Sequence, residues 1–208
     1  MKKYLSLVVV IAVSAMLWSC GDKNSWTIKG SVEGADSTTL VLEAPGYGGW
    51  YALDSVMLDK NGKFKFSQPA LGYPEVFRLV ANNHKVYFPI DSIETVKFNG
   101  YASALDSAYT LEGSVMAEMM MTIDQKIAAI VAKGGEQALA TDSLLKRELS
   151  GMIIGDTDGL LSYYIINKRV GNTAIFDVNN KKDLRIIGAV ANKFSQQRPN
   201  DPRTESLK

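Results

Sequence analysis

LDSVMLDKNGKFKF, residues 53–66, identifies the first half of this 208-residue chain as β-structure. Phe64 and Phe66 alternate with lysines, and a second apolar run ends at Leu58, on the other side of Asn61-Gly62. Asparagine and glycine both tolerate positive φ, so an Asn-Gly pair between two such runs indicates a tight hairpin. We therefore expect residues 53–58 and 64–66 to form neighbouring antiparallel strands.

Short apolar runs of the same kind extend in both directions from this stretch. Trp26, Ile28 and Val32 alternate with polar residues, and Asn82-Asn83 separates two runs at residues 76–80 and 86–88 as a second hairpin would. Short strands with frequent turns are typical of an antiparallel β-sandwich or open barrel. We expect such a domain over residues 26–112.

The apolar period changes after Gly113. Spacings of three and four residues, which place side chains on one face of a helix, predict four helices. The first begins at Ser114, two more cover about 145–155 and 158–169, and the last follows Asn180 with Leu184, Ile187, Ala191 and Phe194 on one face. The fold class is therefore α+β, a β-sandwich or open barrel followed by an amphipathic helical bundle over residues 113–208.

The first twenty residues carry an export signal. Lys2 and Lys3 precede an apolar run from Leu5 to Trp18, and about 14 residues are too few for a spanning helix of roughly 20. Leu17-Trp18-Ser19-Cys20 resembles the lipobox of bacterial lipoprotein precursors. The resemblance implies removal of residues 1–19, a diacylglycerol on Cys20, and a short tether over residues 20–25. An ordinary signal peptide with an accidental cysteine is the alternative.

Charge and location follow from this signal. The formal charge is +1, and loss of Lys2 and Lys3 lowers it to −1, so the mature chain offers no basic surface for nucleic acid. We expect a protein of the cell envelope that is held on the inner or outer membrane by its acyl chains. It would face the periplasm or the cell surface.

Most familiar catalytic and metal motifs are absent. Cys20 is the only cysteine and His84 the only histidine, which excludes a Cys-x-x-Cys pair and a His-rich metal site. The P-loop, H-E-x-x-H and G-x-S-x-G patterns are also missing. We interpret His84 as a solvated turn residue and the methionines between Met116 and Met121 as core side chains rather than copper ligands. We expect no catalytic residue, metal or cofactor.

A glycine-rich loop at residues 45–51 is the candidate binding site. Tyr47, Trp50 and Tyr51 could present flat aromatic faces to a glycan or a peptide. The alternative is a long hairpin loop whose aromatic side chains pack back onto the sheet.

A family resemblance appears once both halves are considered. The chain resembles the N-terminal domain of unknown function that precedes a thioredoxin-like domain in lipoproteins of Bacteroidetes. The landmarks are Ile28-Lys29-Gly30, Leu53-Asp54-Ser55-Val56, Asn61-Gly62-Lys63-Phe64, Tyr73-Pro74-Glu75 and Leu111-Glu112-Gly113-Ser114. In that family a thioredoxin fold with a cysteine pair follows. None of the matching positions is catalytic, so no active-site residue carries over.

These observations predict a lipid-anchored, non-catalytic module that serves as the positioning or recognition part of a thiol–disulfide system. One alternative is a truncated oxidoreductase. Asp201-Pro202 is a typical helix start, and the sequence stops only a few residues later, at Lys208, as a shortened chain would. The other is an independent lipoprotein that binds a glycan, a peptide or another envelope protein.

Overall fold

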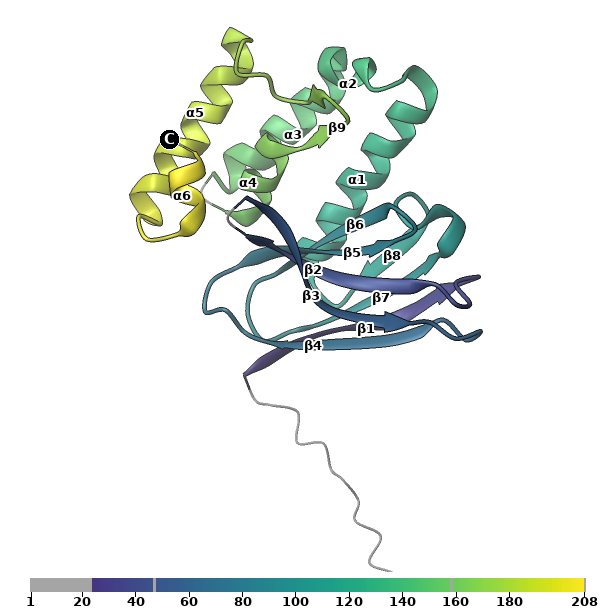
Figure 1. The fold of residues 1–208 in the computed structure, drawn as a ribbon. Coiled ribbons are helices and arrows are strands. Elements are labelled where there is room, and N and C mark those ends of the chain that lie inside the picture. Colours follow the sequence, from purple (N-terminus) through teal and green to yellow (C-terminus); the bar gives the residue numbers. More distant parts are fainter. Residues whose placement is uncertain (1–23, 47, 158, 208) are drawn as a thin grey trace, which may run out of the picture.

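The computed structural model describes residues 24–46, 48–157 and 159–207. The signal, the tether at Cys20 and the aromatic side chain of Tyr47 lie outside these residues. Two sheets face each other, and the helices cover one side of the pair (Figure 1). The predicted α+β class and sandwich are confirmed, and the sheets do not close into a barrel. None of the described helices is long and apolar enough to cross a membrane.

Each large sheet has four strands. The first sheet has the order β4 (Lys63–Pro69), β1 (Ser25–Glu33), β7 (Thr95–Tyr101) and β8 (Tyr109–Glu112). The second has the order β3 (Gly49–Met57), β2 (Thr39–Gly46), β5 (Glu75–Ala81) and β6 (His84–Ile90). All neighbours are antiparallel except β1 and β7, which run parallel. The chain therefore crosses between sheets several times.

One predicted hairpin is wrong in its pairing. Asn61-Gly62 does form a turn, with a φ of 62° at Gly62, but β3 pairs with β2 while β4 pairs with β1. The turn carries the chain from one sheet to the other, and the backbone N–H of Val32 donates to the Gly62 carbonyl at 2.9 Å. The alternation of apolar and polar residues and the residues of the turn indicate only local geometry. The strand that pairs with β4 is decided by the burial of Phe64 and Phe66 between the sheets.

The second predicted hairpin is confirmed. β5 and β6 pair from Ala81↔His84 outward, and the two connecting residues, Asn82 and Asn83, have φ values of 48° and 69°. Two consecutive left-handed residues match the twist of the strands that they join.

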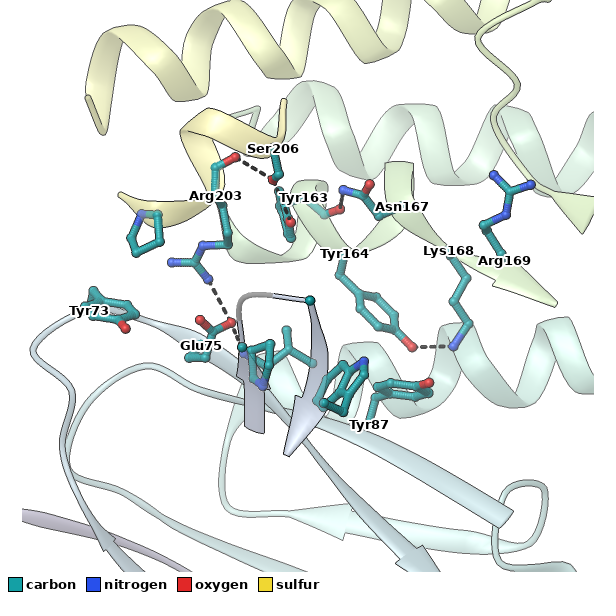
Figure 2. Close-up of a pocket in the computed structure, with 16 residues that line it drawn as sticks. Tyr73, Glu75, Tyr87, Tyr163, Tyr164, Asn167, Lys168, Arg169, Arg203 and Ser206 are labelled. Atoms are coloured by element: carbon teal, nitrogen blue, oxygen red, sulfur yellow. Dashed lines mark hydrogen bonds and ion pairs between the residues drawn. The ribbon is translucent and has the colours of Figure 1, made fainter. Parts of the chain in front are cut away.

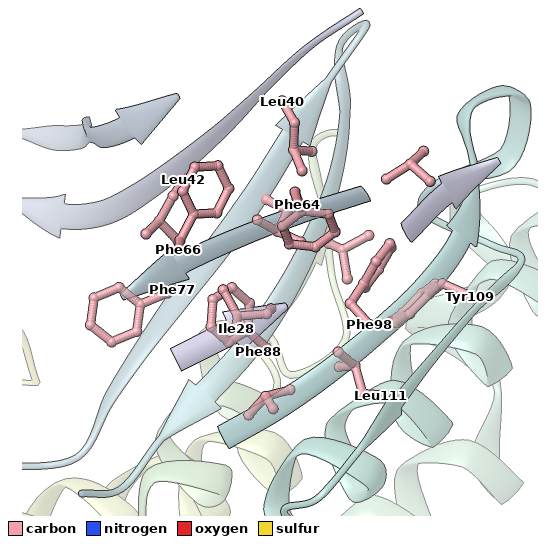
Figure 3. Packing of buried hydrophobic residues seen from close by; sticks show 14 of the residues in the cluster. Ile28, Leu40, Leu42, Phe64, Phe66, Phe77, Phe88, Phe98, Tyr109 and Leu111 are labelled. Atoms are coloured by element: carbon pink, nitrogen blue, oxygen red, sulfur yellow. The ribbon is translucent and has the colours of Figure 1, made fainter. Parts of the chain in front are cut away.

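The core between the sheets is rich in aromatic rings. Phe66, Phe77, Phe88 and Phe98 are fully buried there (Figure 3). Trp26 is fully buried in the same cluster. The ring centroids of Trp26 and Phe77 lie 4.4 Å apart and those of Trp26 and Phe88 lie 6.1 Å apart, and the second distance is within the range in which edge-on aromatic pairs attract. The two sheets form most of this core, and Ala117 of the first helix joins it.

Six α-helices follow the sandwich in the part of the chain that the structure describes. They are α1 (Val115–Gly134), α2 (Gln137–Thr141), α3 (Ser143–Gly155), α4 (Leu160–Asn167), α5 (Lys181–Gln197) and α6 (Pro202–Ser206). A small ribbon of β9 (Arg169–Val170) and β10 (Thr173–Ala174) lies between α4 and α5, and a short 3-10 helix, η1 (Ala102–Ala104), follows β7. The stripe predicted for the first helix is confirmed, because Met120, Ile123 and Ile127 are buried.

The stripe predicted for α5 is partly wrong. Leu184 is 49% exposed, whereas Asp183, Val190 and Phe194 face inward. Lys146 Nζ binds Asp183 Oδ2 at 2.6 Å, and the same oxygen accepts from the backbone N–H of Asp177. These buried polar bonds turn the Asp183 side of the helix toward the body, and Leu184, one residue further round, is left in solvent.

The helices pack on the outer face of the second sheet. Val76, Trp50 and Tyr87 of that sheet contact the cluster formed by Ile123, Ile165 and other helical residues. β5 is consequently covered on both faces, which explains its nearly unbroken apolar sequence EVFRLVA.

Candidate functional site

A cavity of about 730 Å³ lies where the tip of the β2–β3 hairpin meets the helices. The start of β5, α4 and α6 form its other walls (Figure 2). Five aromatic side chains line it, namely Trp50, Tyr73, Tyr87, Tyr163 and Tyr164, together with Lys168, Arg169 and Arg203. Figure 2 shows Tyr73 and Arg203 at one end and Lys168 and Arg169 at the other. The site is therefore an elongated aromatic groove with a cationic group at each end.

Trp50 is held firmly in this groove. Its ring meets Tyr87 edge-on at 5.6 Å, and the Arg78 guanidinium lies 4.3 Å from its centroid. Arg78 Nε in turn donates to Glu43 Oε2 at 2.5 Å. A half-buried ring fixed by a cation–π contact and an aromatic neighbour can offer one edge to a ligand without reordering.

Of the predicted aromatic residues, the structure describes Trp50 and Tyr51, and these two lie in different places. Tyr51 follows Trp50 on β3 and so points to the opposite face; it is 52% exposed and is absent from the described lining of the cavity. A Cβ added at Gly46 would lie 2.8 Å from its ring, so Tyr51 lies against the hairpin tip. The structure brings Trp50, and not Tyr51, to the groove.

A buried polar network forms one wall. Lys168 Nζ lies 2.7 Å from Asp124 Oδ1 and donates to the Tyr164 hydroxyl, which donates to both Asp124 oxygens at 2.7 Å. Burial raises the pKa of Tyr164 well above its ordinary value, and the Asp124 charge raises it further. Tyr164 therefore stays protonated and acts as a hydrogen-bond donor.

Arg203 closes the opposite end. Its guanidinium makes two bonds to Asp201, at 2.8 and 2.6 Å, and a third to Glu75 Oε1 at 3.3 Å. Glu75 Oε1 also accepts from the Val76 N–H at 2.8 Å. Burial raises the pKa of Glu75, although the charge of Arg203 opposes this. Asp201 caps α6 by accepting from the Arg203 N–H, so one cluster ties the last helix to β5.

Arg169 differs from the other two cations. Its Nη2 donates to the Asn172 carbonyl at 3.0 Å, and no carboxylate of the described residues pairs with it. An anionic group on a ligand could bind here at a low desolvation cost, because the guanidinium is exposed.

Sequence reasoning missed most of this site. Tyr73, Tyr87 and Tyr163 belong to separate parts of the chain, and no local spacing connects them. Tyr73-Pro74-Glu75 is a landmark of the family resemblance, and that signal could have indicated two residues of the wall. The third cation, Arg203, lies 128 residues from Glu75.

The other candidate residues have structural surroundings. His84 begins β6 and its Nδ1 lies 3.0 Å from Asp106 Oδ2, outside the described lining of the cavity. Met120 is buried, whereas the Met121 sulfur accepts from the Leu111 N–H at 3.1 Å, so these methionines face different environments. Within the described ranges no group of three or more His, Cys, Asp or Glu side chains could hold a metal ion.

Comparison with known proteins gives a match to one family, whereas no curated protein matches the chain. The family described as "Domain of unknown function (DUF4369)" matches residues 26–194, which include both large sheets, the groove residue Trp50 and most of the helices. The chain belongs to the DUF4369 family.

Proposed function

We propose that this protein is a non-catalytic recognition module that holds a ligand in the groove between the β2–β3 hairpin and the helices. The observation that carries this proposal is the convergence of five aromatic rings, from segments far apart in the sequence, on one cavity of about 730 Å³. A concave, largely aromatic site with a few fixed polar groups is typical of small-molecule and peptide recognition.

The lining favours a glycan or a peptide as ligand. Tyrosine and tryptophan offer flat faces for sugar rings or planar amides, and the amide of Asn167 and the hydroxyl of Ser206 add hydrogen-bonding groups. Arg169 would bind a carboxylate, which both uronic sugars and peptides can carry. An additional envelope protein could supply such a peptide segment.

The electrostatics support binding rather than catalysis. Lys168 is paired with Asp124, and Arg203 with Asp201 and Glu75. A general base or nucleophile needs a group that can give or take a proton at the substrate, whereas these groups satisfy one another. Paired charges of this kind hold the surrounding tyrosines in place.

Replacing Trp50 by alanine should weaken ligand binding by about two- to tenfold, since aromatic contacts contribute roughly 0.5–1.5 kcal/mol beyond the area that they bury. Calorimetric titration with a panel of neutral and uronic oligosaccharides and short peptides measures this. Tyr51→Ala is the matched control, because Tyr51 is the adjacent aromatic residue on the other face of β3, and it should bind normally.

Thermal unfolding must accompany that titration. Trp50 packs on Tyr87 and Arg78, so Trp50→Ala is also expected to lower stability, and Trp50→Phe keeps a ring that can preserve the fold. Equal loss of binding in the Tyr51 and Trp50 variants, or no binding by any member of the panel, would contradict the proposal.

We further propose that Cys20 carries a lipid and holds the module on an envelope membrane. The support is the lipobox-like sequence Leu17-Trp18-Ser19-Cys20. Metabolic labelling with a palmitate analogue should mark the wild-type protein, and Cys20→Ala should abolish the label, block removal of the signal at this site and free any processed protein from membranes. Label that persists in the variant would overturn the anchor.

A role beside a thioredoxin-like partner is the second candidate function. The support for it is the resemblance to domains that precede thioredoxin folds, while the match to DUF4369 assigns residues 26–194 to a domain of unknown function. In such a system this module would position or select a substrate for a partner that bears the cysteine pair.

This candidate makes a direct prediction for residues 20–208. The protein should not reduce insulin disulfides, because a single cysteine cannot complete a dithiol cycle, but it should bind an added thioredoxin-like partner or its substrate. Insulin precipitation with dithiothreitol measures the first part. Reduction above the background of a Cys20→Ser protein would show that the chain carries activity of its own.

A further inference from the structure

We infer that the end of the sandwich where β1 begins rests on the lipid bilayer, through the loops at residues 70–74 and 91–94. The inference depends on the lipid proposed for Cys20. The partner that these two loops contact is a zwitterionic lipid surface.

The length of the tether supports this orientation. Cys20 and Asn24 are four residues apart, and an extended chain covers at most about 3.5 Å per residue, or roughly 14 Å. β1 begins at Ser25. Whatever lies at this end of the fold is therefore held within a short distance of the acyl chains.

Two loops flank the point where the chain enters the fold. The Ala70 N–H donates to the Asn24 carbonyl at 2.8 Å, and the Thr27 N–H donates to the Glu94 carbonyl at 2.9 Å. The first loop connects β4 to β5 and the second connects β6 to β7, so both cross between the sheets at this end (Figure 1).

Both loops expose apolar side chains. Leu71 is 48% exposed and Ile93 is 53% exposed. Val115, the first residue of α1, is 77% exposed, and it follows Gly113, whose added Cβ would meet the Thr95 carbonyl at the start of β7. The segment 69–74 contains no charged residue. Exposed apolar side chains in a loop without charged residues favour contact with an apolar phase over contact with water.

The opposite end of the sandwich has a different character. Its turns contain Asp59, Lys60 and Asn61 in one case and Asn82-Asn83 in another. Exposed apolar side chains are present there too, at Met57 and Tyr101, but they are the last residues of β3 and β7, whereas Leu71 and Ile93 lie in the connecting loops. The two ends therefore differ in what they offer to a membrane.

The charge near the loops selects the kind of lipid. Asp91 and Glu94 flank Ile93, and Glu112 ends β8, the neighbour of β7; the two loops contain no lysine or arginine. Anionic headgroups would be repelled by these carboxylates. Contact therefore depends on the tether and the apolar side chains, and it should be strongest on phosphatidylcholine.

This orientation also places the groove. Tyr73 belongs to the first loop and lines the cavity, so a loop that rests on the bilayer also forms one wall of the binding site. A ligand would then enter close to the membrane surface.

Hydrogen–deuterium exchange on vesicles tests the inference. Residues 20–208 are coupled through the Cys20 thiol to a maleimide lipid in phosphatidylcholine vesicles, and exchange is compared with the uncoupled protein. Exchange of the amides of residues 70–73 and 91–94 should slow by about tenfold, as expected if the loops contact lipid about nine-tenths of the time. The turns at 59–62 and 82–83 should not change.

A paired variant separates contact from crowding. Leu71→Asp with Ile93→Asp should remove the slowing while leaving exchange in the core strands unchanged, and replacing a third of the lipid by phosphatidylglycerol should reduce it. Equal slowing at both ends, or no slowing at the loops, would overturn the inference. Because the coupling is chemical, this result is independent of palmitate labelling in cells, and failure of the natural anchor is detected separately.

Discussion

Replacing Arg203 by methionine should destabilise the protein by about 3–5 kcal/mol, because removal of one partner leaves a buried charge without compensation. The Arg203 side chain is 7% exposed and binds both Asp201 and Glu75. Methionine fills a similar volume, so the loss reports the charge pairing more than the packing. Urea unfolding at pH 7 followed by circular dichroism measures it.

The loss should depend on pH through Glu75. Burial already raises the pKa of this carboxyl, and Arg203 is the first group that opposes the rise, so the variant has a still higher folded pKa. A carboxyl whose folded pKa exceeds its unfolded pKa costs nothing while both states are protonated, and the cost grows as pH rises through the unfolded pKa. The variant should therefore be closer to wild type near pH 4 than at pH 8.

Two further variants identify the cause. Glu75→Gln in the Arg203→Met background should recover part of the stability, because the uncompensated charge is gone. Arg169→Met is the matched control: its guanidinium is exposed and bonds the Asn172 carbonyl, so it should change stability by no more than about 0.5 kcal/mol. Similar losses of unfolding free energy in the Arg203 and Arg169 variants would show that the buried ion pairs of Arg203 do not stabilise the fold more than an exposed arginine does.

Gly30→Ala should have a comparable effect for a steric reason. Gly30 lies in β1 between β4 and β7, and an added Cβ would stand 1.6 Å from the Phe98 carbonyl oxygen. That oxygen belongs to the backbone of a central strand and cannot turn aside, so the strands must separate. Overpacking usually costs about 1–3 kcal/mol, and a clash with backbone on this scale should reach the top of that range or prevent folding.

A second glycine supplies the control. Gly151 lies in α3, and a methyl group added there would have no atom within 4 Å, so alanine should stabilise the helix by about 0.5–1 kcal/mol. Thermal unfolding of both variants gives the comparison. If Gly30→Ala unfolds at the same temperature as the wild type, the fold does not require the close approach of β1 and β7.

Local features were readable without the tertiary structure. Asn82-Asn83 needs positive φ at two adjacent positions, and that requirement is written in the residue types themselves. Asn180 caps α5 through bonds to two backbone N–H groups, and Asp201-Pro202 opens α6 as its residues predict. Each of these involves residues only a few positions apart, so a window of sequence contains all the necessary information.

The pairing of the strands and the orientation of the helices depend on the tertiary structure. Asn61-Gly62 predicted a turn correctly but not the partner of β4, because a turn has the same local chemistry whether it joins one sheet or two. Leu184 fits the helical period, yet a buried bond between Lys146 and Asp183 rotates α5 away from it. The period of a sequence describes apolar residues alone and carries no account of buried ion pairs.

The candidate site shows the same division. The sequence by itself determined the α+β class, the approximate positions of four of the described helices (α1, α3, α4 and α5) and of the turns, the single cysteine and the aromatic residue Trp50 as a binding candidate. Only the tertiary structure joined Trp50 to Tyr87, Tyr164 and Arg203 and turned Tyr51 away. The physical reason is that a strand sends neighbouring side chains to opposite faces, and which face meets the helices depends on packing between segments more than a hundred residues apart.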